Sequence, residues 1–206
     1  VVVHEHRYQD TPWMRAADRS AVMTALRAES DQLVARHPFG SSSVFELRPW
    51  NEPTVDSPED QGLTPVDLST LELTASHESD RLQNALDGNV ATRWTTDRPQ
   101  AGDEWIEVVF EHPTDVAHVR LSMGSSLYDH PRQLVVEGSD DDGQTYTELY
   151  RGHGFPGFML GLVHEPDSLP VDVGLPPNRS RILRFQQTGR TPSFYWSIHD
   201  LHLWTR

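Results

Sequence analysis

Apolar and polar residues alternate along short segments from Asp67 to the C-terminus. Leucines recur at every second position in residues 71–75 and 199–204. Because successive side chains of a strand point to opposite faces of a sheet, this period of two predicts β-strands. Similar strand character is found in residues 105–110, 116–123, 134–137, 146–150 and 181–186. Turn residues separate these segments, and no strand–helix–strand alternation is present, so the pattern predicts an all-β sandwich.

The first 66 residues follow a different pattern. Thr11-Pro12 is typical of a helix start, and residues 13–37 favour helix until Pro38. Short strands are expected near residues 1–8 and 44–47. We therefore divide the chain into a helical N-terminal segment (1–50), a linker rich in proline and acidic residues (51–66) and a β-sandwich domain (67–206).

Residues 151–178 interrupt the strand pattern with glycines and prolines. We interpret them as a long inserted loop. The loop carries Phe155, Phe158 and Met159. Exposed, these side chains would form an apolar patch suited to a partner; folded back, they would cover the sandwich.

Composition excludes several functions. The formal charge of −14 argues against nucleic acid and against an anionic membrane surface as the main partner. All 17 basic residues are arginines, which excludes lysine chemistry, and the absence of cysteine excludes thiolate chemistry and disulfides. No segment reaches the ~20 apolar residues of a membrane span. The first residues suggest a piece of a longer chain, so we expect contact with a membrane only through a parent protein.

Residues 85–94 (ALDGNVATRW) hold the most informative motif of the chain. Asp87, Asn89 and Thr92 place short oxygen-bearing side chains around Gly88, and calcium is bound by such groups. The alternative is that Asp87 and Asn89 only cap a turn. An EF-hand is excluded, because its twelfth position, counted from Asp87, is Arg98 instead of glutamate.

Five segments, taken in order, resemble one family. They are residues 85–94, 104–108, 116–131, 138–146 and 196–201. Together they resemble the discoidin, or coagulation factor 5/8 type C, domain superfamily, which includes the family 32 carbohydrate-binding modules. The resemblance covers roughly residues 68–206 and implies a discoidin-like eight-stranded jelly-roll β-sandwich.

The resemblance also implies a structural calcium ion. In that family an Asp-Gly-Asn turn commonly binds calcium, and a glutamate of the last strand completes the site. Here the last-strand acid is aspartate, which is one methylene shorter. The implied ligands are Ala85 through its carbonyl, Asp87, Asn89, Thr92 and Asp200.

Sugar-binding residues of the resembled modules lie on loops at one end of the sandwich. By loop position, the candidates are His77, Arg98, Tyr128, Arg132 and Phe194. Each has a structural alternative: a turn residue, an exposed charge, an ion pair at a strand edge, or an aromatic ring that completes the core. Trp94, Trp105 and Trp196 are expected in the core.

No catalytic arrangement is recognisable. His4 with His6, and His199 with His202, are spaced as metal-binding pairs, but scattered histidines are more often surface residues. Asp97, Asp103-Glu104 and Asp129 are acidic, yet nothing in their spacing selects a glycosidase pair. A Gly-x-Ser-x-Gly motif is absent.

We therefore expect a non-catalytic module that binds carbohydrate or a glycoconjugate. It would be an accessory part of a larger exported or membrane-anchored bacterial protein, such as a glycosyltransferase or glycoside hydrolase, in the periplasm or outside the cell. The alternatives are a structural or protein–protein interaction domain without sugar binding, and an unrecognised catalytic domain.

Overall fold

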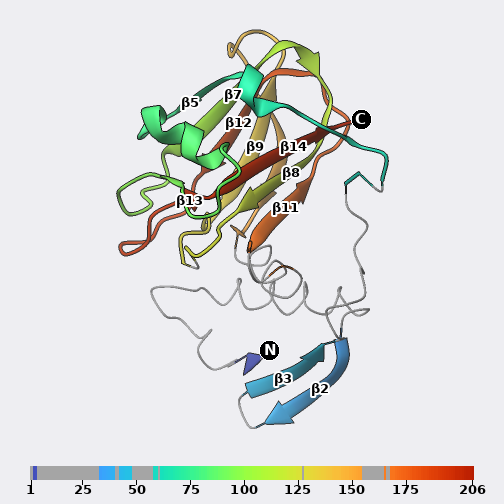
Figure 1. The fold of residues 1–206 in the computed structure, drawn as a ribbon, viewed down its shortest axis with the longest axis vertical. Helices are drawn as coiled ribbons and strands as arrows, with labels where there is room; N and C mark the ends of the chain where they lie inside the picture. Colours follow the sequence, from blue (N-terminus) through green and yellow to red (C-terminus); the bar gives the residue numbers. More distant parts are fainter. Residues whose placement is uncertain are drawn as a thin grey trace.

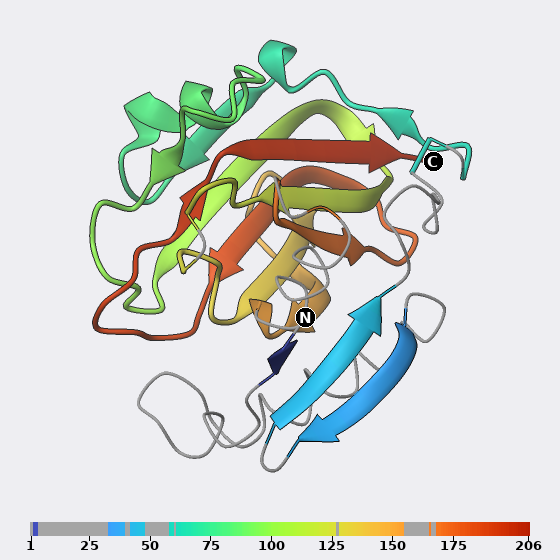
Figure 2. The same cartoon turned by 60° about the horizontal axis from the view of Figure 1, so that its bottom comes forward.

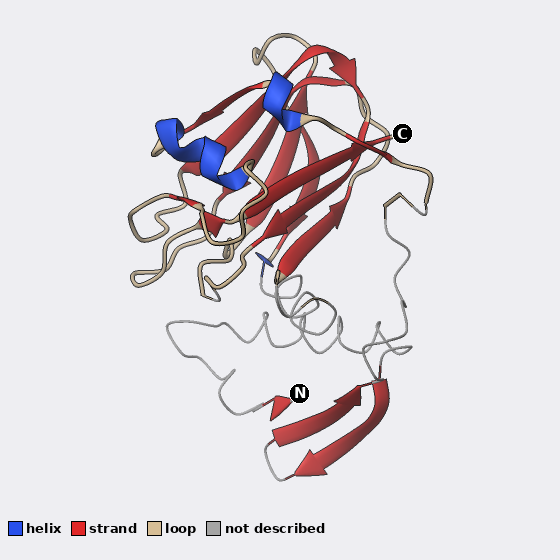
Figure 3. Ribbon diagram, viewed as in Figure 1, coloured by secondary structure: helices blue, strands red, loops and turns tan. Residues whose placement is uncertain are grey.

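The computed structural model describes the strand backbone of residues 2–3, 33–39 and 42–47. It further describes residues 58–59, 61–126, 128–154, 165 and 168–206. Strands dominate this part of the chain, and helix is confined to short segments (Figure 3).

Two antiparallel sheets form the body of the domain (Figure 1). One sheet has the strand order β10-β9-β12-β7-β5 and the other β11-β8-β14-β4. The five-stranded sheet consists of β5 (Glu72–Ala75), β7 (Glu104–Thr114), β9 (Leu134–Ser139), β10 (Thr147–Gly152) and β12 (Ser180–Gln187). The four-stranded sheet consists of β4 (Thr64–Pro65), β8 (Val116–Ser122), β11 (Pro170–Gly174) and β14 (Asp200–Thr205). This architecture confirms the predicted all-β, discoidin-like sandwich.

Smaller elements surround these sheets. A two-stranded sheet pairs β6 with β13, and 3-10 helices η2 and η3 precede and follow β5. Their bounds are β6 (Trp94–Thr95), β13 (Ser197–Ile198), η2 (Leu68–Thr70) and η3 (Ser79–Ala85). A separate sheet near the N-terminus joins β1 (Val2–Val3), β2 (Leu33–Phe39) and β3 (Ser42–Leu47), of which β2 and β3 form a hairpin (Figure 2).

The alternation along β7 shows how the sequence builds the core. Ile106 and Val108 are fully buried, whereas the alternate positions Trp105 and Glu107 are half-buried on the outer face. Trp94 is completely buried against Trp196, with ring centres 5.2 Å apart and planes at 88°. Both tryptophans therefore lie in the core, as expected from the sequence, whereas the same expectation for Trp105 is wrong, because Trp105 is only half-buried.

The register of the five-stranded sheet determines which loops meet. Gln187 of β12 lies opposite both Glu104 of β7 and Leu134 of β9. The loops that precede β7 and β9 and the loop that follows β12 consequently converge at one end of the sandwich, which we call the Gln187 end. At the opposite end, the Ser180 end, Ser180 faces Thr114.

The structure corrects two expectations. The helix expected over residues 13–37 is wrong over 33–37, because Leu33–Phe39 forms strand β2. Residues 33–39 pair with residues 42–47, and this pairing outweighs the helix propensity of Leu33 and Ala35. Residues 13–32 lie outside the described residues.

The second correction concerns the expected loop 151–178. Pro170–Gly174 forms edge strand β11, paired with β8, because Val171 and Val173 both point into the core. Phe155, Phe158 and Met159 lie outside the described residues. In the expected linker, Thr64–Pro65 forms β4, which pairs with the end of β14.

The described residues contain no helix long and apolar enough to span a membrane.

Replacing Trp94 by phenylalanine tests the core. The indole nitrogen donates to the carbonyl of His77 at 3.0 Å, so Trp94→Phe leaves that carbonyl unpaired and a gap beside Trp196. We expect the free energy of unfolding, measured by urea denaturation, to fall by about 2 kcal/mol.

Trp105→Phe is the matched control, since Trp105 is half-buried on the outer face of the sheet. We expect Trp105→Phe to lower the free energy of unfolding by less than about 1 kcal/mol. Equal losses for the two variants would contradict the assignment of Trp94 to the core.

Candidate ligand-binding site

Two aromatic side chains and one arginine come together at the Gln187 end. The rings of Tyr128 and Phe194 stack with centres 5.2 Å apart and planes at 25°. The guanidinium of Arg132 lies 5.2 Å from the centre of the Phe194 ring and donates to the carbonyl of Tyr128 at 2.9 Å. Tyr128 is 64% exposed, an unusual position for so large a ring. The structure thus joins three of the five sequence candidates in one surface.

Gln100 fastens the loops that carry this surface. Its side-chain nitrogen donates to the carbonyls of His130 (3.0 Å) and Tyr195 (2.6 Å), and its side-chain oxygen accepts from the backbone nitrogen of Arg132 (3.0 Å). Its backbone nitrogen donates to the carbonyl of Phe194 at 3.0 Å. Because Gln100 is only 2% exposed, these bonds form in a shielded environment where breaking them is costly.

Glu104 holds the loop that presents Gln100. Its carboxylate is fully buried and accepts from the backbone nitrogens of Ala101 at 2.7 Å and Gly102 at 2.9 Å. Gln187 also donates to it, at 3.3 Å. Gly102 has φ +89°, and a Cβ there would lie 2.8 Å from the carbonyl oxygen of Thr188, so glycine is required for this close approach.

The other two sugar-site candidates have different surroundings. His77 lies beside Trp94, and its ring nitrogen Nδ1 is 2.8 Å from the hydroxyl of Ser76. The guanidinium of Arg98 pairs with Asp103 and, at 3.3 Å, with the buried Glu104. The partners of His77 and Arg98 thus include residues outside the Tyr128–Phe194 pair.

The expected calcium loop closes on itself. The hydroxyl of Thr92 lies 2.8 Å from the Asp87 carboxylate and 2.8 Å from the carbonyl of Asn89. The Asp87 carboxylate accepts from the backbone nitrogen of Asn89 at 2.8 Å. The side-chain oxygen of Asn89 accepts from the backbone nitrogen of Ala91 at 3.1 Å. The carbonyl oxygen of Asn84 is 3.4 Å from the same hydroxyl. A hydroxyl donates one proton, so the Thr92 hydroxyl can satisfy only one of the oxygens around it, and the Asn89 carbonyl also accepts from the backbone nitrogen of Thr92 at 2.9 Å.

Asp200 lies at the start of β14, and its contacts differ from those of the loop. Its carboxylate is 2.7 Å from Nε2 of His202, and this hydrogen bond raises the pKa of His202. No described contact joins Asp200 to Asp87. The loop nevertheless lies against this strand, because Nδ1 of His199 donates to the carbonyl of Val90 at 2.8 Å. Within the described residues, no three or more histidine and acidic side chains are arranged to hold a metal.

The remaining chemical candidates have structural partners. Asp129 accepts from the hydroxyl of Ser197 at 2.7 Å, and Asp103 pairs with Arg98. His199 is buried whereas the side chain of His202 is half-exposed, so the two rings do not form a common pair. His4 and His6 lie outside the described residues.

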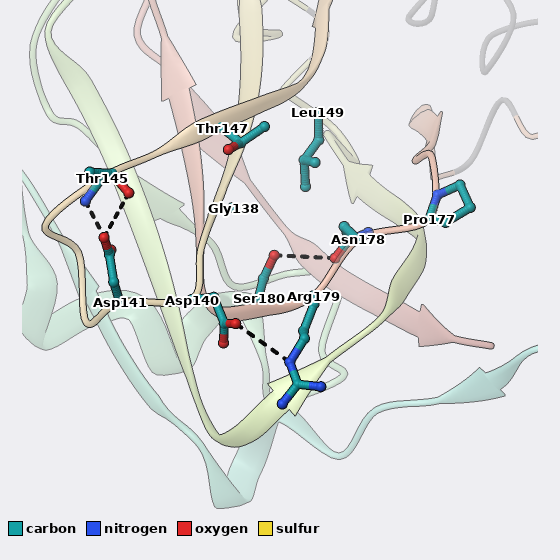
Figure 4. A pocket seen from close by; sticks show the side chains of 10 residues that line it. All are labelled: Gly138, Asp140, Asp141, Thr145, Thr147, Leu149, Pro177, Asn178, Arg179 and Ser180. Carbon is teal, nitrogen blue, oxygen red and sulfur yellow. Dashed lines mark hydrogen bonds and ion pairs between the residues drawn. The ribbon is translucent and has the colours of Figure 1, made fainter.

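A hollow of about 370 Å³ lies at the Ser180 end (Figure 4). Its polar side chains bond to one another: Asp141 accepts from Thr145 at 2.7 Å, Ser180 donates to Asn178 at 3.2 Å, and Asp140 pairs with Arg179. No aromatic ring lines it. The Tyr128–Phe194 surface is therefore the better candidate site.

Sequence reasoning found the exposed part of this site and missed its support. Gln100 and Glu104 carry no spacing signal: Gln100 bonds to loops that are distant in sequence, and Glu104 bonds to its own loop and to the distant Gln187. Only the strand register shows that both side chains are buried.

Comparisons with known proteins agree with this architecture. The sequence model of the F5/8 type C domain family matches residues 70–200. No curated protein matches the sequence.

Three solved structures illustrate the similarity. A family 32 carbohydrate-binding module of a family 31 glycoside hydrolase from Clostridium perfringens is 24% identical and superimposes with a TM-score of 0.52 over 69% of this chain and 95% of that one. The family 32 module of C. perfringens NanJ in complex with galactose is 16% identical, with a TM-score of 0.53 over 69% and 98% of the two chains. Two such modules of C. perfringens ZmpB in complex with GalNAc are 16% identical, with a TM-score of 0.54 over 71% and 37%.

At these identities the solved structures show a shared fold. The sequence match covers most of the β-sandwich, from η2 to the start of β14. The resemblance expected from the sequence is thereby confirmed, and the chain belongs to the F5/8 type C domain family.

Proposed function

We propose that this protein is a non-catalytic module that binds carbohydrate or a glycoconjugate at the Gln187 end. The observation that carries the proposal is the exposed ring of Tyr128, stacked on Phe194 beside the Arg132 guanidinium. Aromatic faces pack against the apolar face of a sugar, while a guanidinium donates to its hydroxyls in a fixed geometry.

Related modules support this choice of ligand. Solved neighbours hold galactose, GalNAc and 4,5-unsaturated mannuronic acid. We further propose that the module serves a larger exported or membrane-anchored protein, such as a glycosyltransferase or glycoside hydrolase, outside the cytoplasm. The alternative is an interaction domain whose exposed Tyr128 contacts another protein.

Removing either half of the proposed site should weaken sugar binding. In isothermal titration with galactose and GalNAc, we expect Tyr128→Ala and Arg132→Ala each to raise Kd at least tenfold, which corresponds to about 1.4 kcal/mol. The reason is the loss of the stacking face in one variant and of the guanidinium donors in the other.

Arg179→Ala is the matched control, because this exposed arginine lies at the Ser180 end. Its Kd should equal that of the unchanged protein. If a glycan array shows no binding to the unchanged protein, the sugar-binding proposal is wrong and the interaction domain is favoured.

We also propose that the Asp87 loop binds calcium. The fit rests on the oxygens of Asp87, Asn89 and Asn84 that surround the Thr92 hydroxyl. Calcium is bound by such carboxylate and carbonyl oxygens, and a bound ion would tie the loop together. Asp200 remains a proposed ligand, which would have to leave His202 to reach the ion.

Calcium removal should therefore lower the melting temperature. At 100 times Kd a bound ion adds about 2.7 kcal/mol, and chelation with EDTA should reverse a shift of several degrees. Asp87→Ala should abolish the response. Asp141→Ala should keep it, because Asp141 caps a comparable turn at Thr145. An equal response in both variants, or none in the unchanged protein, would show that Asp87 only caps a turn.

A further inference from the structure

We infer that His199 is a positioning residue that joins two loops of the Gln187 end into one unit. One is the Asp87 loop (residues 86–93), and the other is the Tyr128 loop (residues 123–126 and 128–130). The inference rests on the proposed function in so far as Tyr128 contacts the sugar. Its evidence is a set of buried hydrogen bonds that does not involve any ligand.

The imidazole of His199 makes one bond to each loop. Nδ1 is 2.8 Å from the carbonyl oxygen of Val90, and Nε2 is 2.9 Å from the hydroxyl of Ser126. A carbonyl only accepts, so Nδ1 carries the proton. In the neutral ring, Nε2 then accepts from Ser126. Arg93 donates to the same serine oxygen, which gives every group in this chain of bonds a partner.

The imidazole of His199 is enclosed by protein, so its two hydrogen bonds form in only one arrangement of the loops. His199 is 2% exposed and Ser126 8%. A Cβ at Gly124 would lie 2.7 Å from Cγ of the ring, and Gly124 has φ +50°, so the imidazole packs directly on the backbone of the Tyr128 loop. A buried donor or acceptor that loses its partner is costly, and the loop cannot shift without breaking such a pair.

Further bonds extend from Ser126 to the aromatic site. The backbone nitrogen of Asp129 donates to the carbonyl of Ser126 at 3.0 Å. Ser197 of β13 in turn donates to Asp129, from its backbone at 3.1 Å and from its hydroxyl at 2.7 Å. Tyr128 therefore lies in a turn that is held on one side by His199 and on the other by β13.

This arrangement predicts that order in one loop supports order in the other. Any event that fixes Val90 also restricts the ring, and through Ser126 the ring restricts the turn of Tyr128. Such coupling is reciprocal, so a sugar that fixes the Tyr128 loop would likewise stabilise the Asp87 loop.

Two near-isosteric variants separate the two bonds. In His199→Asn the amide lies where Nδ1 lay, so it retains the bond to Val90 and loses the bond to Ser126. In His199→Gln the amide reaches the position of Nε2, so it retains the bond to Ser126 and loses the bond to Val90. His199→Ala loses both, and Ser126→Ala reproduces the asparagine defect without touching the histidine.

Amide hydrogen exchange reads each loop separately in the ligand-free protein. Thr92 reports on the Asp87 loop and Asp129 on the Tyr128 loop, because both amides donate to carbonyls within their own loop. We expect exchange to accelerate at least tenfold at Thr92 in His199→Gln, at Asp129 in His199→Asn and Ser126→Ala, and at both in His199→Ala. In each single-bond variant the amide of the other loop should accelerate less, because the ring passes on only part of the change. Val108 in β7 is the control amide and should not change.

Equal acceleration of the two loops in His199→Gln and His199→Asn, or no change in either, would overturn the inference, since His199 would then only fill space. Galactose titration of the same variants tests the link to function: Kd should rise in His199→Asn and Ser126→Ala and rise less in His199→Gln. If the unchanged protein does not bind sugar, the proposed function is wrong, while the exchange pattern still decides the role of His199.

Discussion

The shape of the Gln187 end depends on burial of two polar side chains, Glu104 and Gln100. An antiparallel register brings three loops to the same end, but register alone leaves their backbone groups unpaired. Glu104 fixes the loop that precedes β7 by accepting from its backbone. Gln100 lies in the same loop and donates to the loop that precedes β9 and to the loop that follows β12. The side chains of Glu104 and Gln100 are themselves buried and pair with backbone groups of these loops, so the surface that the loops form is held in one shape.

A prearranged surface suits sugar recognition. Binding a sugar gains little per contact, so loops that had to become ordered on binding would lose much of that gain. The stacked rings and guanidinium are already assembled, and the buried network of His199 and Ser126 adds a second support beneath the Tyr128 loop. The hollow at the Ser180 end differs, because its polar groups are consumed by contacts with one another.

Much of the fold could be predicted from the sequence, since apolar positions of β5, β7, β8, β12 and β14 recur with period two and β9 begins with a short apolar run. Predictions failed where tertiary pairing decides the structure: Leu33–Phe39 has helix formers but pairs as a strand, and β11 is short and proline-flanked. In the site, Tyr128, Arg132 and Phe194 were identified by loop position. Gln100 and Ser126 were not, because their roles depend on contacts 30 to 95 residues away, such as Gln100 with Tyr195. The support from Glu104 was missed because its carboxylate is buried, which the sequence does not show.

The central claim is that the loops gathered by Gln100 and Glu104 form the binding surface. The most direct measurement is the mapping of amide chemical shifts by NMR as galactose is added. The account predicts that the shifts that change cluster in the loops at Gln100, Arg132 and Phe194. Changes confined to the hollow at Asp140 and Arg179, with the aromatic end unaffected, would contradict it.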